Sequence, residues 1–82
     1  MKGGHVGSVN CIVWQYRDAK GKVVSGGNDG SLRFWDARAG KCNQWIQAHS
    51  GGVTGLVYLT THGGGGIVAS SSKDGTIRVV KV

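Results

Sequence analysis

The sequence predicts an all-β fold made of two tandem units of short antiparallel strands, and three observations carry this prediction. A pattern that runs from Ser25 to Asp36 returns 45 positions later, from Ser70 to Lys81. A shorter pattern that begins at His5 returns 44 positions later at His49. Asp-Gly pairs separate short apolar runs, which is a strong signal of β-hairpins. The chain is therefore a tandem repeat with a period of about 44 or 45 residues.

The first strand of each unit is expected at Val9 to Trp14 and at Val53 to Leu59. Both runs are apolar on both faces, as in strands that lie between neighbouring sheets. The second strands are expected at Lys22 to Gly26 and Ile67 to Ser71, and the third strands, which alternate apolar and basic residues, at Leu32 to Trp35 and Thr76 to Val80.

The turns between the second and third strands contain Asp29-Gly30 and Asp74-Gly75. Such turns need a positive φ, which glycine adopts without a Cβ clash. A fourth strand is expected only in the first unit, at Lys41 to Gln47, because two residues remain after Val80 in the second.

These landmarks resemble those of the WD40 repeat family: a Gly-His or Ala-His pair, a serine in the second strand, an Asp-Gly turn and Trp35-Asp36 at the end of the third strand. The resemblance covers nearly everything from Gly4 onward, and it implies antiparallel blades of a β-propeller. Repeat two departs from the pattern at Val80 and Lys81, which replace the Trp-Asp pair. We expect a leader at 1–4, a first repeat at 5–48 and an incomplete second repeat at 49–82.

Two blades are too few for a closed propeller, which has 4 to 8 of them, and repeat units need at least about three copies to bury their faces. Three arrangements remain open. The chain is a fragment of a larger propeller, a self-assembling partial propeller, or a piece that another chain completes. The predicted fold is a partial propeller whose second blade lacks the outer strand.

Composition restricts the function classes. Ten Lys and Arg against four acidic residues give a net charge of +6, which favours an acidic protein surface or nucleic acid as partner. The basic residues are nonetheless scattered, which favours solvated strand edges over a binding patch. No signal peptide or apolar run of membrane-spanning length is evident, so we expect an intracellular protein, cytoplasmic or nuclear, with no membrane partner. Cys11 and Cys42 lack paired spacing and are expected as free thiols, without a metal or cofactor.

Two sets of serine, histidine and aspartate recur at matching positions, and they are the residue types of a hydrolase triad. By resemblance they imply instead a buried structural tetrad, in which Asp holds His, His holds the hydroxyl, and the hydroxyl accepts from a Trp indole N–H. Duplication and the lack of evident oxyanion donors favour architecture, so we expect no catalytic residue. Val80 cannot donate a hydrogen bond, which predicts that repeat two is the softer blade. The tetrad residues are His5, Ser25, Asp29 and Trp35 in repeat one, and His49, Ser70 and Asp74 in repeat two.

The resemblance also implies surfaces for partners. The family's variable contact positions correspond here to Ser8, Asn10, Asn28, Gly52, Thr54 and Lys73. The segment from Val23 to Arg38 resembles the W-D-x-R box through which some WD40 proteins engage the adaptor of cullin-4 ubiquitin ligases, and Arg38 would be the contact residue. The sequence thus predicts a non-enzymatic scaffold for protein partners. An RNA-associated propeller and a cullin-4 substrate receptor remain alternatives.

Overall fold

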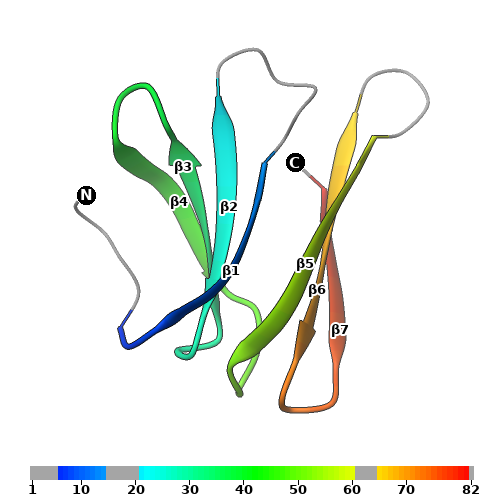
Figure 1. The fold of residues 1–82 in the computed structure, drawn as a ribbon. Coiled ribbons are helices and arrows are strands. Elements are labelled where there is room, and N and C mark those ends of the chain that lie inside the picture. Colours follow the sequence, from blue (N-terminus) through cyan, green and yellow to red (C-terminus); the bar gives the residue numbers. More distant parts are fainter. Residues whose placement is uncertain (1–5, 15–20, 61–64, 82) are drawn as a thin grey trace.

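The computed structural model describes residues 6–14, 21–60 and 65–81. Over these residues it contains seven strands and no helix, which confirms the all-β prediction (Figure 1). The described part has no helix long and apolar enough to cross a membrane. The strands are β1 (Val9–Trp14), β2 (Lys22–Gly27), β3 (Ser31–Asp36), β4 (Lys41–Gln47), β5 (Val53–Thr60), β6 (Gly66–Ser72) and β7 (Ile77–Lys81).

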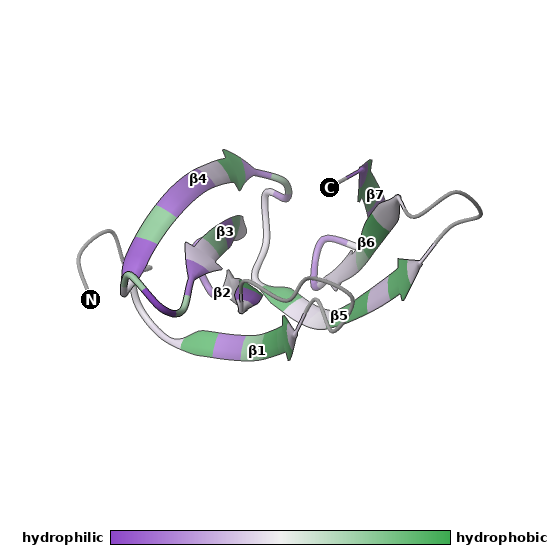
Figure 2. Cartoon of the chain, turned by 90° about the horizontal axis from the view of Figure 1, so that it is seen from above, coloured by the Kyte–Doolittle hydropathy of each residue, from purple (hydrophilic) through white to green (hydrophobic). Residues whose placement is uncertain are grey.

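The strands form two antiparallel sheets in simple sequential order. Blade 1 is the four-stranded sheet β1-β2-β3-β4, and blade 2 is the three-stranded sheet β5-β6-β7. Figure 2 shows β1 and β5 along the same side of the molecule, with the other strands of each blade fanning away from them. The expected second blade without an outer strand is therefore what the described residues form.

Glycines close the β2–β3 and β6–β7 turns as the sequence indicated. Gly30 has φ +78° and its N–H donates to the Gly27 carbonyl at 3.1 Å. Gly75 has φ +86° and makes the same bond to the Ser72 carbonyl. Only the glycine of each turn has a positive φ, so these are loops of at least three residues rather than two-residue turns.

A β-bulge interrupts each inner strand at the same place. The register shifts between Val9 and Cys11 in β1 and between Val53 and Gly55 in β5. A bulge leaves one residue unpaired and re-aims the strand. Here the residue passed over is Asn10 in blade 1, and its amide donates to the Val53 carbonyl of blade 2 at 2.9 Å.

The core lies in the seam between the blades. Val24 and Leu32 of blade 1 are fully buried against Val53, Tyr58 and Val68 of blade 2. Burial of such side chains contributes about 1.5–3 kcal/mol each, so the seam is the main apolar contribution to stability.

The backbone at Gly26 forms the closest part of this seam. A Cβ at that position would lie 2.5 Å from the Val53 Cγ1 atom. Only glycine lets the inner strand of blade 2 approach so closely.

Both inner strands were expected to lie between neighbouring sheets, and within the described residues each is covered on one face only. Ile12 and Trp14 of β1 are 68% and 64% exposed, and Val57 and Leu59 of β5 are 53% and 49% exposed.

Candidate functional site

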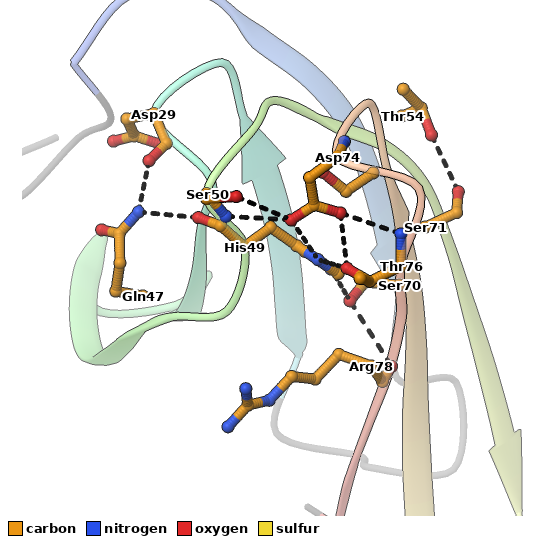
Figure 3. A network of polar contacts seen from close by, with 11 residues as sticks. Asp29, Gln47, His49, Ser50, Thr54, Ser70, Ser71, Asp74, Thr76 and Arg78 are labelled. Atoms are coloured by element: carbon orange, nitrogen blue, oxygen red, sulfur yellow. Dashed lines mark hydrogen bonds and ion pairs between the residues drawn. The ribbon is translucent and has the colours of Figure 1, made fainter.

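A chain of hydrogen bonds in blade 2 joins an aspartate to a serine through two other side chains (Figure 3). Thr76 Oγ1 donates to Asp74 Oδ1. With its proton so placed, this hydroxyl accepts from His49 Nδ1 at 2.9 Å. His49 Nε2 lies 2.7 Å from Ser70 Oγ. Because the Thr76 hydroxyl donates to Asp74, its contact with the ring requires a proton on His49 Nδ1.

Backbone donors complete the environment of Asp74. Its carboxylate accepts from the N–H of Thr76 at 2.9 Å and from the N–H of Ser50 at 3.0 Å. The Thr76 hydroxyl, together with these N–H groups, holds the pKa of Asp74 well below its ordinary value of 3.8, outweighing partial desolvation. The carboxylate is therefore charged at neutral pH and anchors the segment that follows His49.

The expected approach of Asp74 to His49 is present at 3.6 Å between Asp74 Oδ2 and His49 Nδ1, and the Thr76 hydroxyl, at 2.9 Å, is the nearer partner of the ring. The interpretation of the sequence overlooked Thr76 and its counterpart Ser31. The sequence feature that could have identified them is the hydroxyl residue that directly follows each Asp-Gly pair.

Blade 1 contains the indole bond that the resemblance implies. Trp35 Nε1 donates to Ser25 Oγ at 2.8 Å, and both side chains are buried. In blade 2, where Val80 replaces the indole, the Ser70 hydroxyl lies 3.4 Å from the Arg78 carbonyl. The two serines thus occupy matching positions with different partners.

Asp29 repeats the turn chemistry of Asp74. Its Oδ1 accepts from the N–H of Ser31 at 3.1 Å and from the Ser31 hydroxyl at 2.8 Å, while Oδ2 accepts from the Val6 N–H at 3.0 Å. His5, the fourth residue of the predicted tetrad in repeat one, lies outside the described residues.

The Ser70, His49 and Asp74 set has hydrolase-like residue types but not the access of an active site. Ser70 is 1% exposed and His49 is 4% exposed, so their reactive atoms face the blade interior. Buried polar groups of this kind need partners, and this set supplies them. Among the described residues no cluster of three His, Cys, Asp or Glu could hold a metal ion. Cys11 and Cys42 are free thiols.

The predicted contact positions gather at the loops that join the strands at one end of the blades. The Asn28 N–H donates to the Ser8 carbonyl, and the Lys73 N–H donates to the Gly52 carbonyl, each at 2.9 Å. Ser8, Asn28 and Lys73 are exposed, whereas Gly52 is buried. The structure thus places these residues in two equivalent corners, one on each blade.

Two further predicted contact residues are engaged inside the chain. The Asn10 amide donates to Asn28 Oδ1 at 2.9 Å as well as to the blade 2 backbone. Thr54 Oγ1 lies 2.9 Å from Ser71 Oγ. Asn10 therefore helps to hold the seam.

Arg38 lies in the turn between β3 and β4, at the opposite end of β3 from the Asp-Gly loop. Asp36 Oδ1 accepts from the backbone N–H of Arg38 at 3.0 Å and of Ala39 at 3.2 Å. The Gly40 N–H closes the turn on the Asp36 carbonyl at 2.9 Å. Arg38 itself is exposed. Asp36 thus shapes the turn that presents the arginine.

Comparison with known proteins agrees with this geometry. The model of the family described as WD domain, G-beta repeat matches residues 2–36 and 40–81. The chain belongs to the WD40 repeat family. The first match includes Ser25, Asp29 and Trp35 of blade 1, and the second includes His49, Ser70 and Asp74 of blade 2.

Several curated proteins are similar to this WD40 chain. Protein Notchless of Drosophila melanogaster is 35% identical over 79 residues, which cover 93% of this chain and 15% of that protein. DDB1- and CUL4-associated factor 13 of Xenopus tropicalis is 40% identical over 53 residues, 65% of this chain and 12% of the relative. THO complex subunit 3 of Arabidopsis thaliana is 32% identical over 81 residues, with shares of 96% and 24%. The chain spans less than a quarter of the length of each.

Proposed function

We propose that this chain is a non-catalytic WD40 segment that mediates protein–protein contacts as part of a β-propeller. The observation that carries the proposal is the use of every described serine, histidine and aspartate of the tetrads in internal hydrogen bonds. What remains for function is the exposed surface at the two ends of the blades. Such surfaces recognise partners through a few well-placed side chains.

The scaffold proposal is tested by affinity purification of the tagged chain from cells and by a fluorophosphonate probe. We expect a stoichiometric protein partner that is lost with Gly26→Ala, since a Cβ there meets Val53 and opens the seam. The probe should not label Ser70. Labelling that disappears in His49→Ala would replace the scaffold by a hydrolase.

A narrower candidate is docking to the adaptor of cullin-4 ubiquitin ligases through Arg38. Three features support it: the box ending at Arg38, the Asp36-held turn that presents this exposed side chain, and the similarity to a relative named for association with DDB1 and CUL4. A guanidinium can make forked hydrogen bonds with carboxylates or carbonyls of a partner.

Direct binding to the purified adaptor tests this candidate. Arg38→Ala should weaken binding by about 2 kcal/mol or more, a value typical of an important charged contact. Lys41→Ala is the matched control, because Lys41 is an exposed cation on the neighbouring strand. Equal binding by the two variants, or none by the wild type, removes the ligase candidate. Association with RNA remains a prediction from net charge alone.

A further inference from the structure

We propose that one end of this chain binds the phosphate backbone of a single-stranded nucleic acid. The surface lies where β2 and β4 begin and where β3 and β7 end, and we call it the basic end. Its charged residues are Lys22, Asp36, Arg38, Lys41 and Lys81. The proposal goes beyond protein scaffolding because it names a second class of partner and the side chains that would contact it.

Basic residues that are scattered in the sequence are brought together by the strand order. Because neighbouring strands run antiparallel, β2 and β4 begin where β3 ends, and β7 of blade 2 ends on the same side of the molecule (Figure 1). Four of the seven Lys and Arg residues that the structure describes lie at this end, with one of the three described carboxylates. The positive charge of the described residues is therefore concentrated at the basic end.

The opposite end of the blades has the reverse balance. Asp29 and Asp74 occupy the Asp-Gly turns there, and Lys73 is the described cation beside them. Arg33 lies within β3, where its guanidinium contacts the Asp29 carboxylate and the ring of Trp45. This distribution of charge orients a polyanion toward the basic end.

Two lysines of blade 1 flank a carboxylate that is already in use. The cross-strand register places Lys22 and Lys41 on either side of Asp36. Asp36 Oδ1 accepts two backbone N–H groups of the β3–β4 turn, and neither lysine forms an ion pair with a described residue. Adjacent strands lie about 4.8 Å apart, so the two lysine side chains leave the sheet about 10 Å from each other. Both ammonium groups are available to a partner.

Blade 2 adds to this surface through its departure from the repeat. Asp36 is the register partner of Lys22 in blade 1, and Lys81 is the partner of Ile67 at the equivalent position in blade 2. A lysine thus lies where the repeat has an aspartate, and it is exposed. The change reverses the sign of one charge at the basic end and extends the surface onto the second blade.

The basic end does not depend on how many blades surround the chain. Blades of a propeller are arranged radially about a central channel. A neighbouring blade therefore covers the faces of a sheet and leaves its strand ends exposed. The surface is present both in the chain by itself and in a larger propeller.

The composition of the basic end favours phosphates over a protein surface. Lysine is depleted in protein interfaces, whose energetic centres are mainly Trp, Tyr and Arg. Three of the four cations here are lysines, and the other residues of the β3–β4 turn are alanine and glycine. Lysines neutralise phosphates as point charges, and such contacts give affinity without reading sequence. A flexible single strand can bring successive phosphates to cations on two blades, whereas a duplex is stiff.

Fluorescence anisotropy with a short labelled oligouridylate, measured over a range of salt concentrations, tests this surface. Each phosphate contact contributes a slope of about −0.7 to the logarithm of affinity against that of salt, or about fivefold in affinity at about 0.1 M salt. Lys22→Gln and Lys41→Gln should each weaken binding by about fivefold and make the slope less steep by about 0.7. Lys41→Arg keeps the charge and should bind as the wild type does.

Lys73→Gln is the matched control, because it removes the same charge from an exposed lysine at the opposite end. Six-residue strands separate the two ends by about 20 Å, beyond the Debye length of about 10 Å at about 0.1 M salt. We expect its affinity to equal that of the wild type. Equal losses from Lys73→Gln and Lys41→Gln would mean that net charge alone attracts the RNA, which overturns the proposal. A wild type that does not bind overturns it as well.

Competition distinguishes a nucleic acid from an acidic protein as the occupant. A glutamate-rich peptide of the same total charge should displace the oligouridylate only weakly, since release of the counterions condensed on the phosphates drives the binding. Displacement equal to that by unlabelled RNA would assign the basic end to an acidic protein and overturn the proposal. The lysine variants should bind the cullin-4 adaptor as the wild type does, because that candidate rests on Arg38. Failure of either proposal therefore leaves the other unaffected.

Discussion

The carbonyl oxygen of Gly30 accepts the backbone N–H of His49 at 3.0 Å, which ties the turn of blade 1 to the buried histidine of blade 2. The same oxygen accepts the Ala48 N–H at 3.2 Å, and the Gln47 amide bridges the Asp29 and His49 carbonyls (Figure 3). The two repeats are therefore joined by polar contacts in addition to the apolar seam. The turn of blade 1 holds the backbone of His49, whereas the His49 ring contacts Thr76 and Ser70 of blade 2.

Alanine substitutions at Gly30 and Gly75 should distinguish the stability that comes from the contact between Gly30 and His49 from the cost of placing alanine in a left-handed backbone conformation. Gly30→Ala meets both a left-handed backbone and the His49 carbonyl at 2.1 Å, so we expect a loss of at least about 2 kcal/mol. Gly75→Ala has the backbone cost alone, about 1 kcal/mol, because its surroundings are open. Urea unfolding in dilute solution measures both. Equal losses there would show that the turn of blade 1 does not hold His49.

Trp35→Phe removes the indole donor and leaves the buried Ser25 hydroxyl without that bond. We expect the free energy of unfolding to fall by about 1–3 kcal/mol, the cost of a broken buried hydrogen bond. Trp45→Phe is the control, because Trp45 is 54% exposed and phenylalanine would keep an aromatic ring over the Arg33 guanidinium. Its effect should stay within about 0.5 kcal/mol. If the urea midpoints of the two variants coincide, the indole bond does not stabilise blade 1.

Period, strand order and turn positions could be predicted because they are local properties of the sequence. Asp-Gly between two apolar runs specifies a hairpin whatever packs on it, and the positive φ of Gly30 and Gly75 follows from the turn itself. The bounds differed slightly where propensity is weak. The third strand of repeat two was expected to begin at Thr76, but Thr76 uses its backbone N–H on Asp74 and the strand begins at Ile77.

The seam and the relay could not be predicted from local pattern. Gly26 looks like any strand glycine until Val53 from the other blade is placed 2.5 Å from its missing Cβ. Exposure of Ile12 and Trp14 depends on whether a further blade is present, which periodicity does not report. The Thr76 hydroxyl was overlooked because threonine is common in strands on account of its β-branched side chain, whatever its hydroxyl contacts. Its role depends on where His49 lies, and that is a tertiary fact.

Acidification should weaken blade 2 through Asp74. Because the pKa of this carboxyl is lowered in the folded state, the unfolded chain binds a proton first as pH falls below about 4. The stabilisation is complete above the ordinary pKa of 3.8 and is lost progressively as the pH drops toward the lower folded-state pKa. Urea midpoints of wild type and Asp74→Asn, compared at pH 7 and pH 3, measure this contribution. Parallel pH dependence of the two proteins would show that Asp74 does not couple to folding.

The hydroxyl of Thr76 should matter more than its methyl group. Thr76→Val keeps the shape but removes the donor to Asp74 and the acceptor for His49 Nδ1, which leaves the Nδ1–H of the buried ring without its hydrogen-bond acceptor. We expect a loss of about 1–3 kcal/mol, since an unsatisfied buried donor costs its desolvation. Thr76→Ser keeps the hydroxyl, as Ser31 does in blade 1, and should recover most of the loss. The hydrogen-exchange protection of the His49 backbone N–H should follow the same order. Stability of Thr76→Val equal to that of Thr76→Ser would mean that the ring reaches Asp74 directly and that the relay contributes nothing.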